Sequence, residues 1–212
     1  IKYIGTDKDV QVNLIDFENP DSNTLRVTTE ATFHVGREHR RYDVVLWVNG
    51  FPLVVGEMKT PKDKNISWLN GATDVHNAYE KKTPEFFVPN VLSFASEGRE
   101  FRYGAVGQPP ELWLNWSSTA DAIMPPGLPN MLRSAELLLN PKMVLDILRS
   151  FTLYSSRRTA NGAIRTKVIP RYPQVEAVEA IVARCKDPNK KQGLIWHHQG
   201  SGKTFAMAYA AA

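Results

Sequence analysis

The 212-residue sequence contains one cysteine, Cys185, and no apolar run of the roughly 20 residues that a membrane-spanning helix requires. A single cysteine excludes an intrachain disulfide framework and a cysteine-rich zinc site, which favours a reduced, intracellular environment. The opening residues 1–4 lack the apolar stretch of a secretory signal peptide. We therefore expect a soluble protein that remains in the cytoplasm and has no membrane partner.

The composition is that of an ordinary globular protein, with 42% hydrophobic and 23% charged residues and no low-complexity tract or internal repeat. The formal net charge of +4 is compatible with a polyanionic partner, although many proteins without such a partner have a similar charge. The chain starts without Met and ends within a helical pattern at residues 206–212. We expect it to be a fragment, or the ordered part, of a longer protein.

Four segments rich in β-branched and aromatic residues predict strands: residues 24–27, 31–35, 42–48 and 51–59. The dipeptide Asn49-Gly50 predicts a hairpin turn between the last two segments. Apolar residues at three- and four-residue spacing predict a helix over residues 66–82, and strand character returns over residues 86–94. This alternation indicates a mixed α/β domain.

The second half of the chain begins with an irregular segment, residues 104–130, which we expect to pack around Trp113 and Trp116. Two helices should follow in series from Met131, because proline interrupts the apolar stripe at Asn140-Pro141. The next residues are rich in Arg and Lys and poor in apolar side chains, which marks a domain boundary. We therefore predict a domain at 1–154, a basic linker at 155–170 and the start of a second α/β domain at 171–212.

Three residues of the predicted strands form a candidate catalytic site. Asp43 and Glu57 place carboxylates in otherwise apolar segments, and Lys59 follows Glu57 on the same strand face. Carboxylate oxygens bind Mg²⁺, which can neutralise a phosphodiester and generate hydroxide at neutral pH. Lys59 could orient the attacking water or offset charge on the phosphate. The alternative interpretation is that all three are polar residues of an edge strand.

Strand register decides whether these groups can meet. A regular two-residue hairpin turn would set Asp43 opposite Gly56 and send Glu57 to the other face of the sheet. For the Asp43 and Glu57 carboxylates to lie on the same face, the hairpin needs either a three-residue loop centred on Gly50 or a bulge in one strand, for which Gly56 is a suitable position. We predict one of these two irregularities.

Other polar residues fit a catalytic site less well. Glu80 and Lys82 repeat the spacing of the acid and the lysine, but they lie at a polar helix end and are interpreted as solvated charges. Glu30 and His34 lie upstream and could approach the site.

A second motif lies near the end of the sequence. Residues 193–204 predict a short apolar strand, a glycine-rich turn and the start of a helix. Glycines let backbone N–H groups approach phosphates, a lysine can bind the β- and γ-phosphates, and a threonine can bind Mg²⁺. A glycine turn without a ligand is the alternative. The candidate nucleotide-binding residues are Gly200, Ser201, Gly202, Lys203 and Thr204.

Gln174 lies upstream of this turn, after Tyr172-Pro173. The element resembles the one in superfamily 2 helicases in which a glutamine reads the adenine edge. Its separation of 29 residues from Lys203 leaves room for one helix and one strand. A simple helix entry is the alternative. The adjacent His197 and His198 are not predicted to bind metal, because neighbouring strand residues point to opposite faces and further ligands are missing.

Residues 41–61, RYDVVLWVNGFPLVVGEMKTP, resemble the nuclease core of the R (restriction, motor) subunits of type I restriction enzymes. Members of that family have a PD-(D/E)xK-type site. The resemblance implies that Asp43 and Glu57 are metal ligands and that Lys59 is the catalytic lysine. The sequence departs from the motif at Tyr42, which replaces the proline of its name.

A downstream Gln-x-x-x-Tyr element of many relatives is incomplete in this sequence. Tyr79 matches its tyrosine, but Val75 occupies the glutamine position. Tyr79 is therefore either an accessory site residue or an ordinary tyrosine on a helix face.

The resemblance covers most of the chain from about residue 24 onward. It implies a mixed-sheet, restriction-endonuclease-like domain followed by the start of a RecA-like P-loop ATPase domain, with Mg²⁺ and ATP as cofactors. It also implies double-stranded DNA and the modification and specificity subunits as partners, in a bacterial or archaeal cytoplasm. No second acidic motif follows Thr204, so this chain alone is not expected to hydrolyse ATP.

Three alternatives remain open at this point. The first is a nuclease-helicase of DNA repair, the second a motor subunit with a catalytically silent N-terminal docking domain, and the third an ATPase with no nuclease role. Metal binding at Asp43 and Glu57 would argue against the second. An Asp43 side chain directed away from Glu57 would favour the third.

Overall fold

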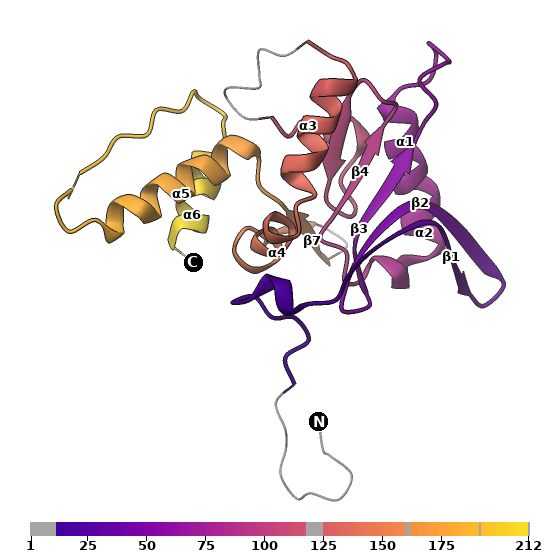
Figure 1. The fold of residues 1–212 in the computed structure, drawn as a ribbon, viewed down its shortest axis with the longest axis horizontal. Helices are drawn as coiled ribbons and strands as arrows, with labels where there is room; N and C mark the ends of the chain where they lie inside the picture. Colours follow the sequence, from indigo (N-terminus) through magenta and orange to yellow (C-terminus); the bar gives the residue numbers. More distant parts are fainter. Residues whose placement is uncertain (1–11, 118–124, 160–161, 191, 212) are drawn as a thin grey trace, which may run out of the picture.

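The computed structural model describes residues 12–117, 125–159, 162–190 and 192–211. A five-stranded mixed sheet in the order β1-β2-β3-β4-β5 forms its centre (Figure 1). The β3–β4 pair is parallel, and the other three pairs are antiparallel. The strands span Leu25–Val35 (β1), Glu38–Val48 (β2), Phe51–Met58 (β3), Leu92–Ser96 (β4) and Phe101–Gly104 (β5). The predicted mixed α/β domain is confirmed.

Helices cover both faces of this sheet (Figure 1). Successive side chains of a strand point to opposite faces of the sheet. Val55 packs on one face with Ala72 and Val75, and Val54 packs on the other face with Met131. The sheet therefore has a hydrophobic core on each face. The first set comprises α1 (Trp68–Asp74), the π-helical turn η2 (Val75–Tyr79) and α2 (Glu80–Lys82), and the second comprises α3 (Leu128–Leu138) and α4 (Pro141–Ser150).

The parallel pairing of β3 with β4 needs a crossover connection, and residues 59–91 supply it. The predicted helix over residues 66–82 forms most of this crossover, although a π-helical turn interrupts it. The predicted strand at residues 86–94 begins instead with a 3₁₀ turn, η3 (Pro84–Phe87), and β4 follows. Two further 3₁₀ turns are η1 (Pro20–Ser22) and η4 (Pro110–Leu112).

The β2–β3 hairpin turns on Asn49 and Gly50, whose φ angles are 50° and 85°. Two successive residues with positive φ make the two-residue turn that matches the twist of an antiparallel hairpin. Val48 pairs with Phe51 immediately beside it. The predicted hairpin turn is confirmed, so the three-residue loop is excluded.

A bulge in β3 changes the register beyond this turn. Trp47 pairs with Pro52, but Leu46 pairs with Val54, which leaves Leu53 as the extra residue. Pro52 has no backbone N–H to donate to the ladder, so the pairing is interrupted beside it. The bulge that convergence of the site requires is therefore present.

The predicted position of the bulge at Gly56 is wrong, and Gly56 has another role. A Cβ atom added at Gly56 would lie 2.1 Å from the Phe94 ring of the neighbouring strand. Only a residue without a side chain fits at this point, so β3 and β4 pack closely where the candidate carboxylate follows.

Two further elements differ from the sequence-based prediction. β1 is one strand of 11 residues, and the predicted interruption between residues 27 and 31 is a kink at Glu30, which has a φ of 53°. β5 was not predicted, because its four residues lie between turn residues and merge with the irregular segment. That segment packs through Trp113 and Trp116 as predicted, since both side chains are buried. Residues 118–124 of this segment lie outside the described residues.

The two predicted helices in series are α3 and α4, and Asn140 separates them. Its side chain accepts a hydrogen bond from the Lys142 N–H and so caps α4, while Pro141 occupies the first helical position. Proline is favoured there because the first N–H of a helix has no partner within the helix.

Most of the basic segment between the two predicted domains forms an antiparallel hairpin, β6 (Leu153–Thr159) and β7 (Gly162–Val168). It leads to α5 (Tyr172–Lys186) and then to α6 (Lys203–Ala211). The side chains of Val175, Val178 and Tyr209 join the same hydrophobic core as α3 and α4. None of the described helices is both long and apolar enough to cross a membrane.

The apolar strand predicted before the glycine-rich turn is wrong for this structure. Residues 192–198 have no regular secondary structure, and Leu194 and Trp196 are each 87% exposed. A strand needs a neighbouring strand to pair its backbone groups, and no described strand lies beside this segment.

Candidate active site

β2 and β3 bring the two predicted carboxylates to opposed positions. Beyond the bulge, Val44 pairs with Gly56, so Asp43 and Glu57 occupy the next opposed pair of positions. Directly opposed residues of antiparallel strands project from the same face of the sheet. The bulge therefore places Asp43 and Glu57 on one face, whereas a regular hairpin would place them on opposite faces. The Asp43 Oδ2 accepts a hydrogen bond from the Met58 N–H at 2.8 Å, which holds this carboxylate against the end of β3.

Glu57 is the buried centre of the cluster, with 4% of its surface exposed. Its Oε1 accepts a hydrogen bond from the Lys59 Nζ at 2.7 Å, and its Oε2 accepts one from the Tyr79 hydroxyl at 2.8 Å. Both carboxylate oxygens therefore have a protein donor, which fixes the orientation of the side chain.

Lys59 is held by its backbone and by two carboxylates. Its N–H donates to the Ser96 carbonyl at 2.8 Å, which extends the β3–β4 pairing beyond the end of β3. Its Nζ lies 2.6 Å from the Asp74 Oδ2 as well as within hydrogen-bond distance of Glu57. The ammonium group is therefore shared between a strand carboxylate and a helix carboxylate.

Asp74, the last residue of α1, is the site residue that sequence reasoning missed. An aspartate on the polar side of a predicted helix is ordinary and gives no signal by itself. A usable signal was Gly71 in the helix interior, since a glycine there often marks a close approach. A Cβ atom added at Gly71 would lie 3.3 Å from the Glu57 Cγ, so α1 lies directly over the carboxylate strand.

Tyr79 reaches Glu57 from the π-helical turn η2. The Glu80 N–H bonds to the Val75 carbonyl, five residues earlier, so this turn contains one residue more than an α-helical turn. The Tyr79 ring also packs edge-on against Tyr42, with 5.3 Å between ring centroids. The structure therefore places Tyr79 in the cluster rather than on a free helix face.

Burial raises the pKa of Glu57, against the hydrogen bonds from Lys59 and Tyr79 that favour its charged form. The nearby charge of Asp43 raises this pKa further. Burial lowers the pKa of Lys59, but the hydrogen bonds to Asp74 and Glu57 outweigh it, so the net shift is upward. Burial and the Glu57 hydrogen bond raise the pKa of Tyr79. Lys59 is thus a stable ammonium and Tyr79 a stable hydroxyl donor, whereas the charge of Glu57 depends on what binds beside it.

The donor set of Asp43 and Glu57 fits a hard divalent cation such as Mg²⁺. Mg²⁺ is commonly held by one or two carboxylates and keeps several water ligands. A nearby cation would also favour the charged form of Glu57, which burial disfavours. Within the described residues, no group of three or more His, Cys, Asp or Glu side chains is placed to hold a metal ion. The two-carboxylate site therefore suits an ion that keeps waters better than one that needs an all-protein cage.

The remaining predicted residues near the site have other roles. The Glu30 carboxylate lies 3.4 Å from the Arg41 guanidinium, and the His34 ring stacks on His39. The interpretation of Glu80 as a solvated charge is wrong, because only 8% of its side chain is exposed and its Oε2 accepts a hydrogen bond from the Gly107 N–H.

The glycine-rich turn leads directly into a helix. Gly200 and Gly202 have φ angles of 79° and 81°, and α6 begins at Lys203. The Lys203 Nζ donates to the carbonyls of His197 at 3.0 Å and His198 at 3.2 Å. The N-terminus of α6 and the Lys203 side chain therefore lie at the same turn.

Gln174 connects α5 to this turn. Its Oε1 accepts a hydrogen bond from the Arg171 N–H at 2.9 Å, and its Nε2 donates to the carbonyls of Ser201 and Gly202 at 3.2 Å each. A cavity of about 380 Å³ lies beside Gln174 and both glycines of the turn.

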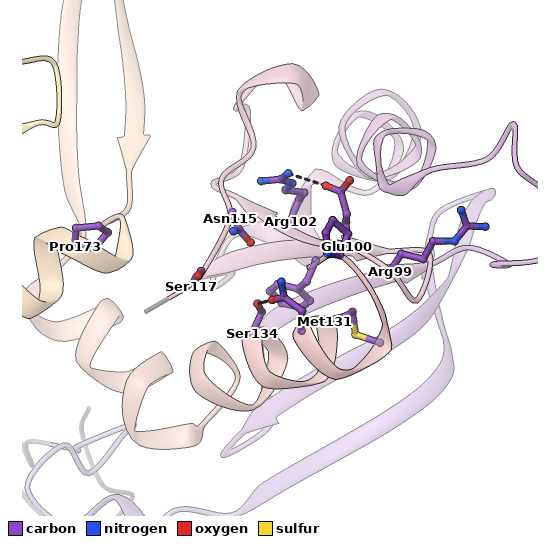
Figure 2. Close-up of a pocket in the computed structure, with 11 residues that line it drawn as sticks. Arg99, Glu100, Arg102, Asn115, Ser117, Met131, Ser134 and Pro173 are labelled. Carbon is purple, nitrogen blue, oxygen red and sulfur yellow. Dashed lines mark hydrogen bonds and ion pairs between the residues drawn. The ribbon is translucent and has the colours of Figure 1, made fainter. Parts of the chain in front are cut away.

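A separate cavity of about 370 Å³, lined by both polar and apolar side chains, lies between β5, α3 and the start of α5 (Figure 2). The Arg102 Nη2 donates to the Glu100 Oε2 at 2.7 Å, and the Arg102 guanidinium lies 5.3 Å from the centre of the Trp68 ring. The Arg99 Nη2 donates to the Pro61 carbonyl at 2.9 Å. These two arginines therefore contact the segment after Lys59 and the start of α1.

Comparison with known proteins places these features in a family. Residues 1–112 match the family model for the type I restriction enzyme R protein N terminus, and residues 173–212 match the model for the SWI2/SNF2 ATPase. The chain is 32% identical to the "Putative type I restriction enzyme MjaVIIP endonuclease subunit" of Methanocaldococcus jannaschii, over 93% of this chain and 19% of that protein. It is 27% identical to the type I restriction enzyme HindI endonuclease subunit of Haemophilus influenzae, over 98% of this chain and 20% of that protein.

The chain therefore spans about a fifth of the length of the curated relatives that it matches. The first family model covers the sheet and the carboxylate–lysine cluster, and the second covers α5, the glycine-rich turn and α6.

Proposed function

The chain belongs to the family of type I restriction enzyme R protein N termini, and on this premise we propose that its subunit cleaves DNA at the Glu57 cluster in a Mg²⁺-dependent reaction. The relatives in the comparison are named as endonuclease subunits of type I restriction enzymes. The proposed site is of the PD-(D/E)xK type, with Asp43 and Glu57 as metal ligands and Lys59 as the catalytic lysine.

One observation carries this proposal. Glu57 is buried, yet its carboxylate contacts the Lys59 ammonium at 2.7 Å and the Tyr79 hydroxyl at 2.8 Å, and the charge of Asp43 acts on it. Buried ionisable groups with opposing influences on their pKa gather at functional sites more often than elsewhere. A purely structural role would be served more cheaply by an apolar side chain at this strand position.

The residues of the cluster divide the work of phosphodiester hydrolysis. Mg²⁺ held by Asp43 and Glu57 would neutralise the phosphate and lower the pKa of the water that attacks phosphorus. Lys59 donates to a non-bridging phosphate oxygen and stabilises the charge that grows as the new P–O bond forms and the old one breaks. Asp74 holds the ammonium group, and Tyr79 holds Glu57.

The second match supports a motor function for the residues that follow. In the proposal, Gln174 contacts the adenine, the turn at Gly200, Ser201 and Gly202 binds the phosphates, Lys203 contacts the β- and γ-phosphates, and Thr204 binds Mg²⁺. ATP hydrolysis by the complete subunit then drives its movement along double-stranded DNA, within a complex that also contains modification and specificity subunits. The nuclease core and the ATP site are thus joined in one chain.

The test is DNA cleavage by the full-length subunit in its assembled complex with Mg²⁺ and ATP, with ATP consumption followed in parallel. Lys59→Ala is expected to abolish cutting and leave ATP consumption unchanged. Asp74→Asn, which leaves the ammonium with Glu57 alone, is expected to slow cutting by about 10–100-fold, as removal of a supporting residue does in metal sites. Asp63→Asn, an exposed aspartate of the same connection, is the matched control and should cut normally.

Cutting by Lys59→Ala at the wild-type rate would contradict the nuclease proposal and favour a silent docking domain. Loss of ATP consumption together with cutting would mean that the substitution damages the whole subunit.

A further inference from the structure

The β6–β7 hairpin lies in the most charge-biased part of the sequence. Residues 147–175 contain six Arg or Lys residues and no Asp or Glu, although the whole chain contains 22 acidic residues in 212. The hairpin is a two-stranded sheet with no third described strand beside it. The six basic residues are Arg149, Arg157, Arg158, Arg165, Lys167 and Arg171.

The strand register gathers part of this charge on one face of the hairpin, which we call the basic face. Tyr154 pairs with Lys167, Ser156 with Arg165 and Arg158 with Ala163. Opposed residues, and residues two apart along a strand, share a face, so these six side chains project together. No acidic residue stands on the other face either, so the hairpin offers no internal counter-charge.

The arginines of the basic face are exposed and have no counter-ion among the described residues. Arg158 and Arg165 are both exposed, and neither forms an ion pair with another residue that the structure describes. Tyr154 on the same face is 66% exposed. Lys167 lies at the base of the hairpin, where its Nζ donates to the Asn90 carbonyl. Burial without a carboxylate partner lowers its pKa to about 8, so an anion beside it would favour its charged form.

The basic face also forms one wall of a groove. A concave space of about 470 Å³ is bounded by Tyr154, Arg165 and Lys167 on the hairpin side and by Val88 and Asn90 on the other side. The residues of the second wall come directly after η3 in the chain. Phe87 of η3 contacts the ring of Tyr42, the residue before Asp43 in β2. The groove is therefore built on the same crossover that carries Asp74 and Tyr79.

We propose that the basic face of β6–β7 binds the phosphate backbone of the double-stranded DNA that the subunit cleaves. This inference rests on the proposed nuclease function, because it assigns a second binding surface to the same substrate. Arginine and lysine side chains supply most phosphate contacts of DNA-binding proteins, and a two-stranded ribbon has the width to enter the major groove. An acidic protein surface fits less well, because the centre of a protein interface is normally depleted of charge.

The test measures the salt dependence of duplex binding by the full-length subunit, using a fluorescent duplex and sodium chloride from low to physiological concentration. Removing one basic side chain that binds a phosphate should reduce the slope of log affinity against log salt by about 1. Arg158→Gln with Arg165→Gln is therefore expected to reduce the slope by about 2 and to weaken binding most at low salt. Arg184→Gln with Lys186→Gln, which removes the same charge from the exposed end of α5, should leave the slope unchanged.

A third variant separates charge from structure. Arg158→Lys with Arg165→Lys keeps both charges, so its slope should match that of the wild type. An unchanged slope for the glutamine variant would overturn the proposal. Normal DNA binding by that variant with loss of assembly into the complex would also overturn it, and would assign the basic face to a protein partner.

The outcome is separable from that of the nuclease proposal. The nuclease proposal is judged by cutting and the hairpin proposal by the salt slope of duplex binding, so either can fail without the other. If Lys59→Ala still cuts, the nuclease site is wrong while the salt slopes still report on the hairpin.

Discussion

The ionisable side chains of the Glu57 cluster include more acidic than basic groups. Asp43, Glu57 and Asp74 would contribute three negative charges and Lys59 one positive charge, a net charge of −2 if all four groups are ionised. Burial and the charge of Asp43 both raise the pKa of Glu57, so its charged form is disfavoured when no cation is present. A bound divalent cation would balance the net charge of the four groups. It would therefore favour the ionised form of the carboxylates, which burial disfavours.

Glu80 is a second buried carboxyl, and it makes stability depend on pH. Burial raises its pKa from 4.5 to about 7. Because the folded pKa lies above the unfolded value, its favourable contribution is complete below about pH 4.5 and is lost as pH rises through about 7. Glu80→Gln keeps a neutral side chain at every pH. It should leave the melting temperature unchanged at pH 5 and raise stability at pH 8 by at most about 3 kcal/mol.

Thermal unfolding of the wild type, Glu80→Gln and Glu85→Gln at both pH values checks this expectation. Glu85 is exposed on η3, so its substitution should have no pH-dependent effect. An equal change in melting temperature at pH 5 and pH 8 for Glu80→Gln would show that Glu80 is ionised in the folded protein throughout this range.

At the scale of elements, the β2–β3 hairpin shows how far sequence reasoning reached. The turn residues Asn49 and Gly50, and the need for an irregularity, follow from the period-two alternation of a strand. The place of the bulge does not follow from the glycine at position 56, because Pro52 interrupts the ladder earlier. The missing N–H of a proline, rather than the flexibility of a glycine, explains where the register changes.

The helix that covers the site shows the complementary limit. Apolar spacing predicts a helix over residues 66–82, but it cannot show the π-helical turn that directs Tyr79 to Glu57. Asp74 was missed for the same reason, since its role depends on which face of α1 lies over β3. The short apolar strand predicted before the glycine-rich turn fails for a different reason, because no described strand pairs with that segment.

Gly56 offers a test of how closely β3 and β4 pack. Gly56→Ala places a methyl group against the Phe94 ring, where an added Cβ would lie 2.1 Å away. Overpacking of this kind should lower the free energy of unfolding by about 1–3 kcal/mol, measured by urea denaturation. The same substitution combined with Phe94→Ala should cost less than the sum of the two single changes, because the smaller residue makes room. Strict additivity would contradict the close approach of Gly56 to Phe94.

At the scale of the whole molecule, the two matched parts share one core. The Tyr103 hydroxyl donates to the Pro170 carbonyl at 2.6 Å, across the start of α5. The Trp116 ring lies edge-on between Tyr103 at 5.4 Å and Tyr172 at 5.3 Å between centroids. Phe151, which lies between the two matched ranges, contacts Tyr209 of α6. The sheet that carries the carboxylate–lysine cluster and the glycine-rich turn are therefore connected by packed aromatic rings rather than by a free connection.

Trp116→Ala tests this connection. Trp116 is fully buried, so its removal should cost about 3–5 kcal/mol and should loosen α5 from the sheet. The expected result is a lower melting temperature together with faster proteolysis of residues 187–202. Trp196→Ala is the matched control, because Trp196 is 87% exposed and its loss should change neither quantity. Equal effects of the two substitutions would mean that Trp116 does not join the two parts.

The positive φ at Glu30 also affects whether another copy of the chain can add a strand to the free edge of β1. β1 is the last strand on its side of the sheet, and within the described residues it pairs only with β2. An 11-residue strand with a free edge is a template on which another chain can add a strand. The positive φ of 53° at Glu30 interrupts the regular strand conformation between residues 25–29 and 31–35, although the register with β2 is the same on both sides. A second chain would therefore meet an irregularity at Glu30 in the row of backbone groups along β1, which makes this edge a poorer template for intermolecular pairing.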